Sequence, residues 1–362
     1  MTHTVMEPGR RDSGHGGSRR RKPQRRRRPW RWVLLALVLI LLIGGGTAWW
    51  FYHKLNSNIS DVDINKALGE DRPKKAGTSG QNLLILGSDS RSGDNANLDT
   101  GDVSGARSDT ALMVHIPEGR SRATAVSIPR DTLVTRPGCT TSEGEELPSA
   151  KRVMFNSVYS LGGPACVVKT VETLSGIRMD HYMEIDFAGF QGLVDALGGV
   201  SITLDKPIND TKGGLHLDAG THHLDGTQSL RLVRTRYGYG DGSDLGRIGL
   251  QQKFMLAVLA EIKKQGVLNS PAKLYKIASS ATESLTTDSG LSSLTSLAKY
   301  GSSLKAIDPN TMETVMMPVQ YDTQDRNRVV AAEPQVKQLW EALRTDQEIP
   351  ESAKKSPATG GE

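Results

Sequence analysis

The segment HYMEIDFAGFQGLVDALGGVSITL (residues 181–204) contains an apolar run, a helical pattern and a second apolar run in succession. His181 to Ile185 and Val200 to Leu204 are short and apolar, as buried strands are. Between them, Phe187 to Leu197 spaces its apolar residues as a helix does, and Gly198-Gly199 then marks a turn that needs positive φ. A strand, a helix and a strand in this order predict a layered α/β domain with a central sheet.

The same alternation extends in both directions from this segment. Strand patterns precede it at residues 82–86, 110–116 and 123–128. Helical patterns occur at 153–161, 165–174, 226–233, 244–265, 271–278, 292–300 and 333–343. We therefore predict one α/β/α domain with a central mixed sheet over residues 82–345, followed by a polar tail at 346–362 that we expect to be disordered.

An uncharged run of 20 residues, Trp32 to Phe51, lies near the N-terminus. About 20 apolar residues span a bilayer, and aromatic rings gather at both ends of this run, where they favour the headgroup layer. A cleaved signal peptide would have a shorter apolar region and a small-residue cleavage site. We therefore predict a retained transmembrane helix at 32–52, with a polar stalk at 53–81 between it and the domain.

The positive charge of the chain lies almost entirely before this helix. Residues 1–31 hold eleven Lys and Arg against two acidic residues, a local charge of +9. Subtracting it from the total of +5 leaves about −4 for the remainder, so the basic tail does not indicate a nucleic-acid-binding domain. Arginines on one flank of a membrane span mark the cytoplasmic side. We expect a single-pass membrane protein with a cytoplasmic N-terminus and an extracytoplasmic domain.

An extracytoplasmic domain would fold under oxidising conditions. The chain has two cysteines, Cys139 and Cys166, which could form a disulfide there. A pair of buried free thiols is the alternative.

Charged residues cluster where the predicted strands end. Each cluster alone could be a surface ion pair of little energetic value. Together, several arginines and aspartates at such positions suit a pyrophosphate and the cation that bridges it, because the guanidinium fork binds phosphate oxygens in pairs. Carboxylates favour a hard ion such as Mg²⁺, with Mn²⁺ as the alternative. The clusters are Gly87 to Arg91, Arg107 to Thr110, Ser127 to Thr132, Arg234 to Arg236, and Asp244 with Arg247 and Gln251.

At these residues the chain resembles the LytR-CpsA-Psr family, which attaches glycopolymers to bacterial peptidoglycan. The resemblance covers roughly residues 82–319 and is carried by GSDSR, RSDT, SIPRDT, FNSVYSLGG, HYMEIDFAGFQGLVDALGGV and LDGTQSLRLVRTR, followed by Asp244, Arg247 and Gln251-Gln252. It implies a phosphotransferase that acts on an undecaprenyl-pyrophosphate-linked glycan, with peptidoglycan as acceptor and the lipid held in an apolar tunnel.

The resemblance also assigns roles to residues. It implies that Asp89 and Asp109 are the Mg²⁺-associated carboxylates. The pyrophosphate-binding residues would be Arg91, Arg107, Arg130, Arg234, Arg236, Arg247 and Gln251. Asp89 or Asp131 could serve as the general base, or Asp131 could only orient Arg130. We count Asp89, Asp109, Arg130 and Asp131 as the candidate catalytic residues.

Two other functions remain open at this point. One is a regulator, or attenuator, that binds polyprenyl-phosphate lipids without catalysis. The other is a polyprenyl-pyrophosphate hydrolase that transfers the same phosphoryl group to water. The identity of the polymer is also open, with teichoic acid and arabinogalactan as examples.

Overall fold

The structure, a computed structural model, describes residues 30–75, 79–88, 108–120, 122–235, 244–270 and 284–359, with residues 273, 276, 277, 279 and 280 between the last two ranges. The chain separates into two units, Met1–Trp50 and Phe51–Glu362. Helix α1 (Trp30–Asn58) contains a 23-residue stretch, Trp32–Lys54, long and apolar enough to cross a membrane. At 1.5 Å per residue this stretch is about 35 Å long, enough for a hydrocarbon core of about 30 Å.

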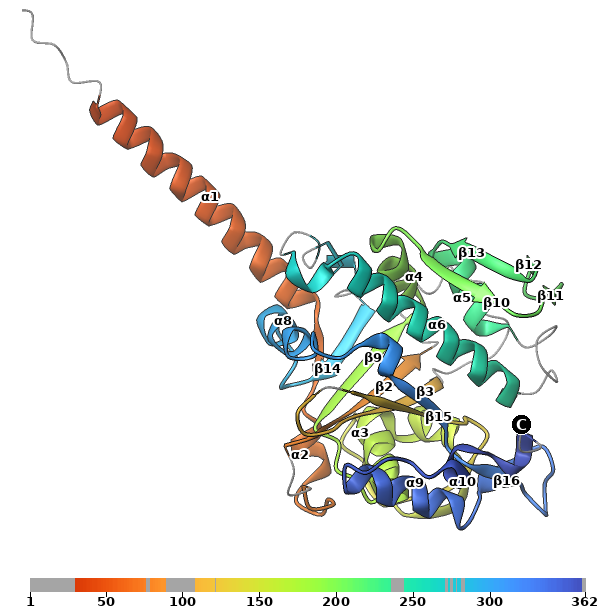
Figure 1. Ribbon diagram of the computed structural model, residues 1–362. Helices are drawn as coiled ribbons and strands as arrows, with labels where there is room; N and C mark the ends of the chain where they lie inside the picture. Colours follow the sequence, from red (N-terminus) through yellow and green to blue (C-terminus); the bar gives the residue numbers. More distant parts are fainter. Residues whose placement is uncertain are drawn as a thin grey trace, which may run out of the picture. The chain divides into compact units, whose positions relative to one another are not determined.

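The second unit is built around a seven-stranded mixed sheet in the order β1-β14-β9-β2-β3-β4-β15 (Figure 1). Strands β2, β9, β4 and β15 run in one direction, and β1, β3 and β14 run in the other. The strands are β1 (Ser60–Val62), β2 (Gln81–Ser88), β3 (Ser108–Ile116), β4 (Thr124–Ile128), β9 (His181–Asp186), β14 (Leu285–Asp288) and β15 (Glu313–Met316). The predicted central mixed sheet is confirmed.

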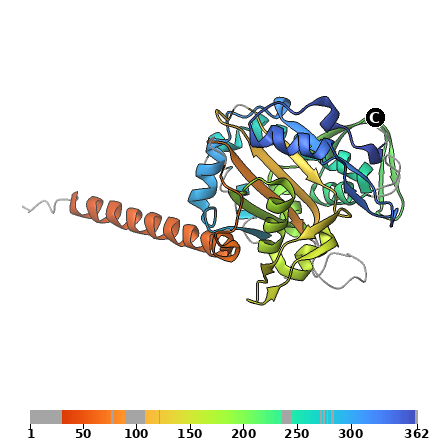
Figure 2. The same cartoon turned by 90° about the horizontal axis from the view of Figure 1, so that it is seen from below.

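Helices cover both faces of this sheet, because its strands alternate two sets of buried residues. Leu84, Leu86 and Met113 face one core with α3 (Phe155–Ser175) and α9 (Gln335–Arg344). Leu83 and Leu112 face the opposite side, where α6 (Asp244–Lys264) and α8 (Leu294–Ser303) lie. Figure 2 shows the sheet from the α3 side. The predicted α/β/α layering is therefore present.

The helix predictions hold with small shifts. α3 covers both predicted helices of this region, which a kink separates: Gly163 has φ 71° and ψ −169°, and Pro164 follows it. α4 (Phe187–Ala196) and α5 (Gly226–Arg234) begin at the predicted residues, each after an aspartate that caps the first turn, Asp186 and Asp225. The predicted helix at 271–278 falls mostly outside the described residues.

Strand β10 (Val200–Leu204) forms as predicted but does not join the central sheet. It pairs only with β13 (Gly220–Leu224), in a two-stranded sheet that packs on α6. The other small sheets pair β5 (Leu133–Arg136) with β8 (Ala150–Met154), β6 (Cys139–Thr140) with β7 (Glu146–Leu147), β11 (Ile208–Asp210) with β12 (Leu215–Leu217), and β16 (Val319–Tyr321) with β17 (Val329–Ala331).

The predicted stalk at 53–81 is wrong for much of its length. β1 pairs with β14 at the edge of the central sheet, and α2 (Ile64–Leu68) packs on α3. Ile59, Ile64 and Leu68 are buried in this unit. These elements are three and five residues long, too short to show a periodic pattern in the sequence.

The predicted disorder of the tail at 346–362 is also wrong for the described residues up to 359. The tail contains the short helix α10 (Glu351–Lys354) and the 3-10 turn η5 (Pro357–Thr359). Ile349 and Ala353 are buried, and the Ser356 hydroxyl accepts a hydrogen bond from the Val319 N–H at 3.0 Å. A few small apolar residues anchor this segment although its average composition is polar.

Candidate functional site

Four strand ends meet at one edge of the central sheet, which we call the catalytic edge. The register pairs Ser88, the last residue of β2, with Ser108 at the start of β3 and with Asp186 at the end of β9. Ile128, which ends β4, pairs with Ala111 of β3. Three of the five predicted charge clusters follow or precede these ends, so the topology brings them together at this edge.

The structure describes only part of the predicted site. Asp89, Arg91, Arg107 and Arg236 lie outside the described residues. Asp109 belongs to β3, but its side chain is not described. The roles predicted for these five residues stay predictions. Arg130, Asp131, Arg234, Arg247 and Gln251 are described, and each can be placed.

Arg130 and Asp131 form the turn that follows β4. The Asn156 N–H, in the first turn of α3, donates to the Arg130 carbonyl at 3.0 Å. Oδ2 of Asp131 lies 3.8 Å from Nε of Arg130, and Oδ1 lies 3.5 Å from Nη1 of Arg328. Of the two roles considered for Asp131, this geometry favours the orientation of Arg130. Arg328 was missed, because no local pattern links it to a turn about 200 residues earlier in the chain.

Arg234, Arg247 and Gln251 come from the packed pair of helices α5 and α6. Arg234 ends α5 and lies over the ring of Phe187, with its guanidinium carbon 4.8 Å from the ring centroid. Gln251 donates from Nε2 to the Val233 carbonyl at 2.9 Å, which ties the end of α5 to α6. Arg247 lies one turn before Gln251 on α6 and is buried, with an exposed fraction of 5%. The positively charged side chains of Arg234 and Arg247 are therefore held where α5 packs on α6.

An apolar cavity of about 220 Å³ begins beside these residues, between the sheet and α6. At one end its wall is polar: Gln251 and Gln252 of α6 face Thr110 and Ser127 of the sheet, and Gln252 donates to the Ser127 hydroxyl at 3.0 Å. The rest of the wall is apolar and includes Phe187, Phe190, Leu193, Phe254 and Val258. In the sequence, Gln252 was indicated as a site residue by its position next to Gln251.

A second apolar cavity, of about 360 Å³, lies further along the same face of the sheet. It is lined by Leu83, Val114 and Ile116 from the strands and by Leu259 and Leu304 from the helices. Ile85 and Met255 line both cavities, so the two adjoin each other. Together they provide an elongated apolar space that starts at the polar residues of the catalytic edge. Such a space suits a long hydrocarbon chain with a polar head.

The opposite face of the sheet carries a buried polar group instead. Glu184 of β9 accepts hydrogen bonds from the hydroxyls of Tyr159 and Tyr182, both at 2.6 Å. Burial raises the pKa of Tyr182 well above its usual value, and the neighbouring Glu184 charge acts in the same direction. Tyr159 therefore packs within this network.

The residues predicted to hold Mg²⁺ fit that ion by their chemistry. Within the described ranges, no group of three or more His, Cys, Asp or Glu residues could hold a metal. Asp89 follows Ser88 and Asp109 follows Ser108, and these two serines are paired at the catalytic edge. Mg²⁺ usually takes one or two carboxylates together with phosphate oxygens, so these residue types suit the ion, and the Mg²⁺ site stays a prediction.

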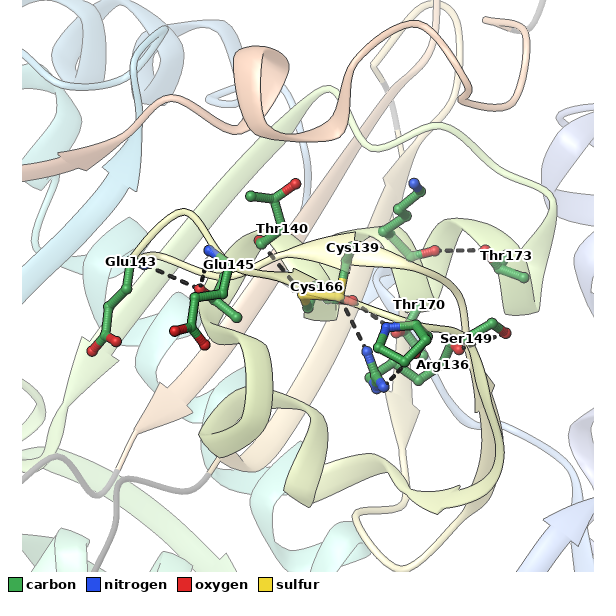
Figure 3. The surroundings of a disulfide bond; sticks show 12 residues. Arg136, Cys139, Thr140, Glu143, Glu145, Ser149, Cys166, Thr170 and Thr173 are labelled. Atoms are coloured by element: carbon green, nitrogen blue, oxygen red, sulfur yellow. Dashed lines mark hydrogen bonds between the residues drawn. A yellow bond between two sulfur atoms is a disulfide. The ribbon is translucent and has the colours of Figure 1, made fainter.

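The two cysteines form a disulfide that joins β6 to α3 (Figure 3). The Cα atoms of Cys139 and Cys166 are 5.5 Å apart, which is a usual separation for such a bond. A Cβ added at Gly162 would lie 2.3 Å from the Cys166 sulfur, so this glycine gives the disulfide its space. The predicted bridge is confirmed.

The chain is similar to curated proteins that are named as cell wall biosynthesis proteins and teichoic acid transferases. The chain is 34% identical over 236 residues to the probable cell wall biosynthesis protein LcpB of Corynebacterium glutamicum, covering 64% of this chain and 54% of LcpB. It is 31% identical over 266 residues to the polyisoprenyl-teichoic acid–peptidoglycan teichoic acid transferase TagT of Bacillus subtilis, covering 70% of this chain and 76% of TagT. The chain thus spans about half the length of LcpB and over two thirds of TagT.

Solved structures share the fold. A LytR-Csp2A-Psr enzyme from Actinomyces oris superposes with a TM-score of 0.57 at 24% identity, covering 79% of this chain and 95% of the other. B. subtilis TagV superposes with a TM-score of 0.58 at 22% identity, covering 74% and 98%. The model of the LytR_cpsA_psr family matches residues 51–345, which include the whole central sheet. The chain therefore belongs to the LytR-cpsA-psr family.

Proposed function

We propose that this protein is a phosphotransferase that moves a glycopolymer from a polyprenyl-pyrophosphate carrier, with undecaprenyl as the chain, to peptidoglycan. The single observation that carries the proposal is the elongated apolar space that begins at the catalytic edge. A lipid pyrophosphate has this same division into an apolar chain and an anionic head. The named activity of TagT, a teichoic acid transfer from a polyisoprenyl carrier to peptidoglycan, supports the assignment.

In the proposed reaction, a hydroxyl oxygen of peptidoglycan attacks the phosphorus that carries the glycan. A new P–O bond joins glycan and peptidoglycan through a phosphodiester, and the bond to the second phosphate breaks. Polyprenyl phosphate leaves, and the hydroxyl proton passes to a carboxylate, for which Asp89 and Asp131 both stay candidates. Such transfer is accelerated mainly by positioning and by cations that neutralise developing charge.

The predicted site residues divide these tasks. Arg130, Arg234 and Arg247 would bind the pyrophosphate oxygens, and Gln251 would fix the end of α5 beside them. Asp89 and Asp109 would hold Mg²⁺, which would supply positive charge to offset the negative charge of the phosphates. Phe187, over which Arg234 lies, would separate the charged head from the apolar chain.

We also propose the topology of the chain. The arginines before Trp32 would keep the N-terminus in the cytoplasm, and the chain that follows the membrane-spanning segment, from about residue 53 onward, would lie outside the cell membrane. The disulfide between Cys139 and Cys166 supports this placement, because structural disulfides persist in oxidising compartments.

The test is Mg²⁺-dependent release of polyprenyl phosphate by the full chain in detergent, from a lipid-pyrophosphate glycan with and without peptidoglycan oligomers. We expect release that requires the acceptor and yields glycan joined to peptidoglycan. Arg234→Ala and Asp109→Ala should each reduce it at least about 100-fold, since each removes charge stabilisation from the transferred group. Arg231→Ala is the matched control, because Arg231 lies one turn earlier on α5 and is exposed.

Three outcomes would contradict the proposal. Release without an acceptor would identify a hydrolase, and tight binding without turnover would leave a lipid-binding regulator. Unchanged transfer in Arg234→Ala would remove α5 from the site.

A further inference from the structure

The hairpin of β16 and β17 lies against the turn that follows β4. The Val329 N–H donates to the Asp131 carbonyl at 3.4 Å, and Thr132 and Val329 form an isolated parallel bridge. Arg328 directly precedes Val329, so the backbone itself places its side chain beside Asp131. The hairpin thus brings a cation to a turn that holds a proposed pyrophosphate ligand, Arg130.

The loop that carries Arg328 is fixed by its own hydrogen bonds. The Asp322 N–H donates to the Arg328 carbonyl, and the Arg328 N–H donates to the Asp325 carbonyl, both at 2.9 Å. The Asp322 carboxylate accepts two bonds from Arg152 of β8, at 2.8 and 3.2 Å, and further bonds from the N–H groups of Gln324 and Asp325. The hydrogen bond from Arg152 lowers the pKa of Asp322 to about 2, so this anchor stays ionised at neutral pH.

The Asp131 carboxylate is shared between two guanidinium groups. One oxygen faces Arg130 at 3.8 Å and the other faces Arg328 at 3.5 Å. The three side chains are only 15 to 30% exposed. Exposed ion pairs are weak partly because two long side chains must lose their freedom. Here backbone hydrogen bonds already fix the main chain at both Asp131 and Arg328, so the ion pair has less conformational freedom left to lose.

We propose that Arg328 is a positioning residue: through Asp131 it holds the Arg130 guanidinium in the orientation that receives the donor's pyrophosphate. This inference rests on the proposed function, since it takes Arg130 as a pyrophosphate ligand. Without Arg328, Asp131 would turn toward Arg130 alone and draw it away from the phosphate. Small displacements of a binding group have large effects on rate, and we expect about a 10-fold loss of affinity for the pyrophosphate head.

The experiment measures binding of undecaprenyl pyrophosphate, without a glycan, to the full chain in detergent, together with the thermal midpoint of each variant. Arg328→Ala should weaken binding about 10-fold with a midpoint close to wild type. Arg328→Lys should restore most of the affinity, because it keeps a cation beside Asp131. Arg326→Ala is the matched control, since Arg326 is exposed two residues away on the same loop.

A double-mutant cycle tests whether Arg328 acts through Asp131. The variant with both Asp131→Asn and Arg328→Ala should bind no more weakly than the weaker of the two single variants. Additive losses would mean that Arg328 contacts the ligand itself, and this would overturn the positioning role. A lower thermal midpoint with unchanged affinity would also overturn it, because it would show a purely structural ion pair.

The same binding measurement distinguishes a failure of the role proposed for Arg328 from a failure of the proposed function. If wild type binds undecaprenyl pyrophosphate and Arg328→Ala binds equally well, the inference alone fails. If wild type does not bind it, the proposed function fails and the inference falls with it.

Discussion

The two faces of the central sheet are built from alternate residues of the same strands, yet they are packed differently. On the α3 face, Leu84, Leu86 and Met113 are completely buried. On the α6 face, Leu83 and Leu112 keep 5 and 8% of their surface exposed and line two apolar cavities. Protein interiors are normally packed to the density of organic crystals. The difference leaves two apolar cavities on the α6 face, which is the space that we propose for the lipid chain.

The disulfide belongs to the well-packed α3 face, and its loss should have the largest effect on stability. It closes a loop with a sequence separation of 27 residues. Loop-closure entropy predicts a loss of roughly 3 to 4 kcal/mol for the double variant Cys139→Ser, Cys166→Ser. Chemical denaturation of wild type and variant measures this loss. A change below about 1 kcal/mol would show that packing alone stabilises the α3 face.

Two methionines, one on each face, offer a matched comparison. Met113→Ala should cost about 3 kcal/mol, because the side chain is fully buried and leaves a new cavity. Met255→Ala should cost less than about 1.5 kcal/mol, because Met255 already borders empty space. Denaturant midpoints of the two variants check this difference. Equal losses would contradict the contrast between the faces.

Enlarging the same two methionines should sharpen the contrast. Met255→Trp would place a ring where the two cavities adjoin, and we expect a 10-fold or larger fall in kcat/KM for a long-chain donor with a nearly unchanged thermal midpoint. Met113→Trp should lower the midpoint strongly, because overpacking a filled core forces strain. The transfer assay and thermal melts report the two effects. Full activity of Met255→Trp would mean that the lipid chain does not use this space.

The smallest predicted effect concerns the protonation of His115, which lies on the α3 face of the sheet. Burial lowers the pKa of His115 below 6.5, although Asp346, whose carboxylate oxygen lies 3.0 Å from Nε2, acts in the opposite direction. As pH falls through 6.5, the unfolded chain binds a proton that the folded protein still resists, so stability decreases. We expect a lower thermal midpoint at pH 5 than at pH 7, with a smaller decrease in His115→Asn. An equal decrease in both proteins would assign the effect to other groups.

Much of the fold was predictable from the sequence, because its signals are local. The apolar run in residues 82–86 and the helical spacing in Phe187 to Leu197 are visible within a few residues of chain. The apolar run at Trp32 to Phe51 is equally plain. β1 and the tail up to Thr359 were missed, because short segments acquire structure only from the partners on which they pack.

The candidate site divides in the same way. The sequence indicated Arg130, Asp131 and Arg234 as charged residues near element ends, and the family resemblance assigned roles to them and to Arg247 and Gln251. Arg328 could not be found, since its place beside Asp131 depends on a hairpin far along the chain. The contact of Gln252 with Ser127 likewise depends on how α6 crosses the sheet.

The sequence by itself determined the apolar segment long enough to cross a membrane, the alternation of strands and helices, and the charged residue types near the strand ends. Each of these follows from side-chain period, length or charge along a short stretch of chain. Only the tertiary structure decided that Cys139 is bonded to Cys166, that α6 leaves an apolar space over the sheet, and that Asp131 lies between two arginines. These features depend on strand register and helix packing, which bring together residues whose distance along the chain carries no signal.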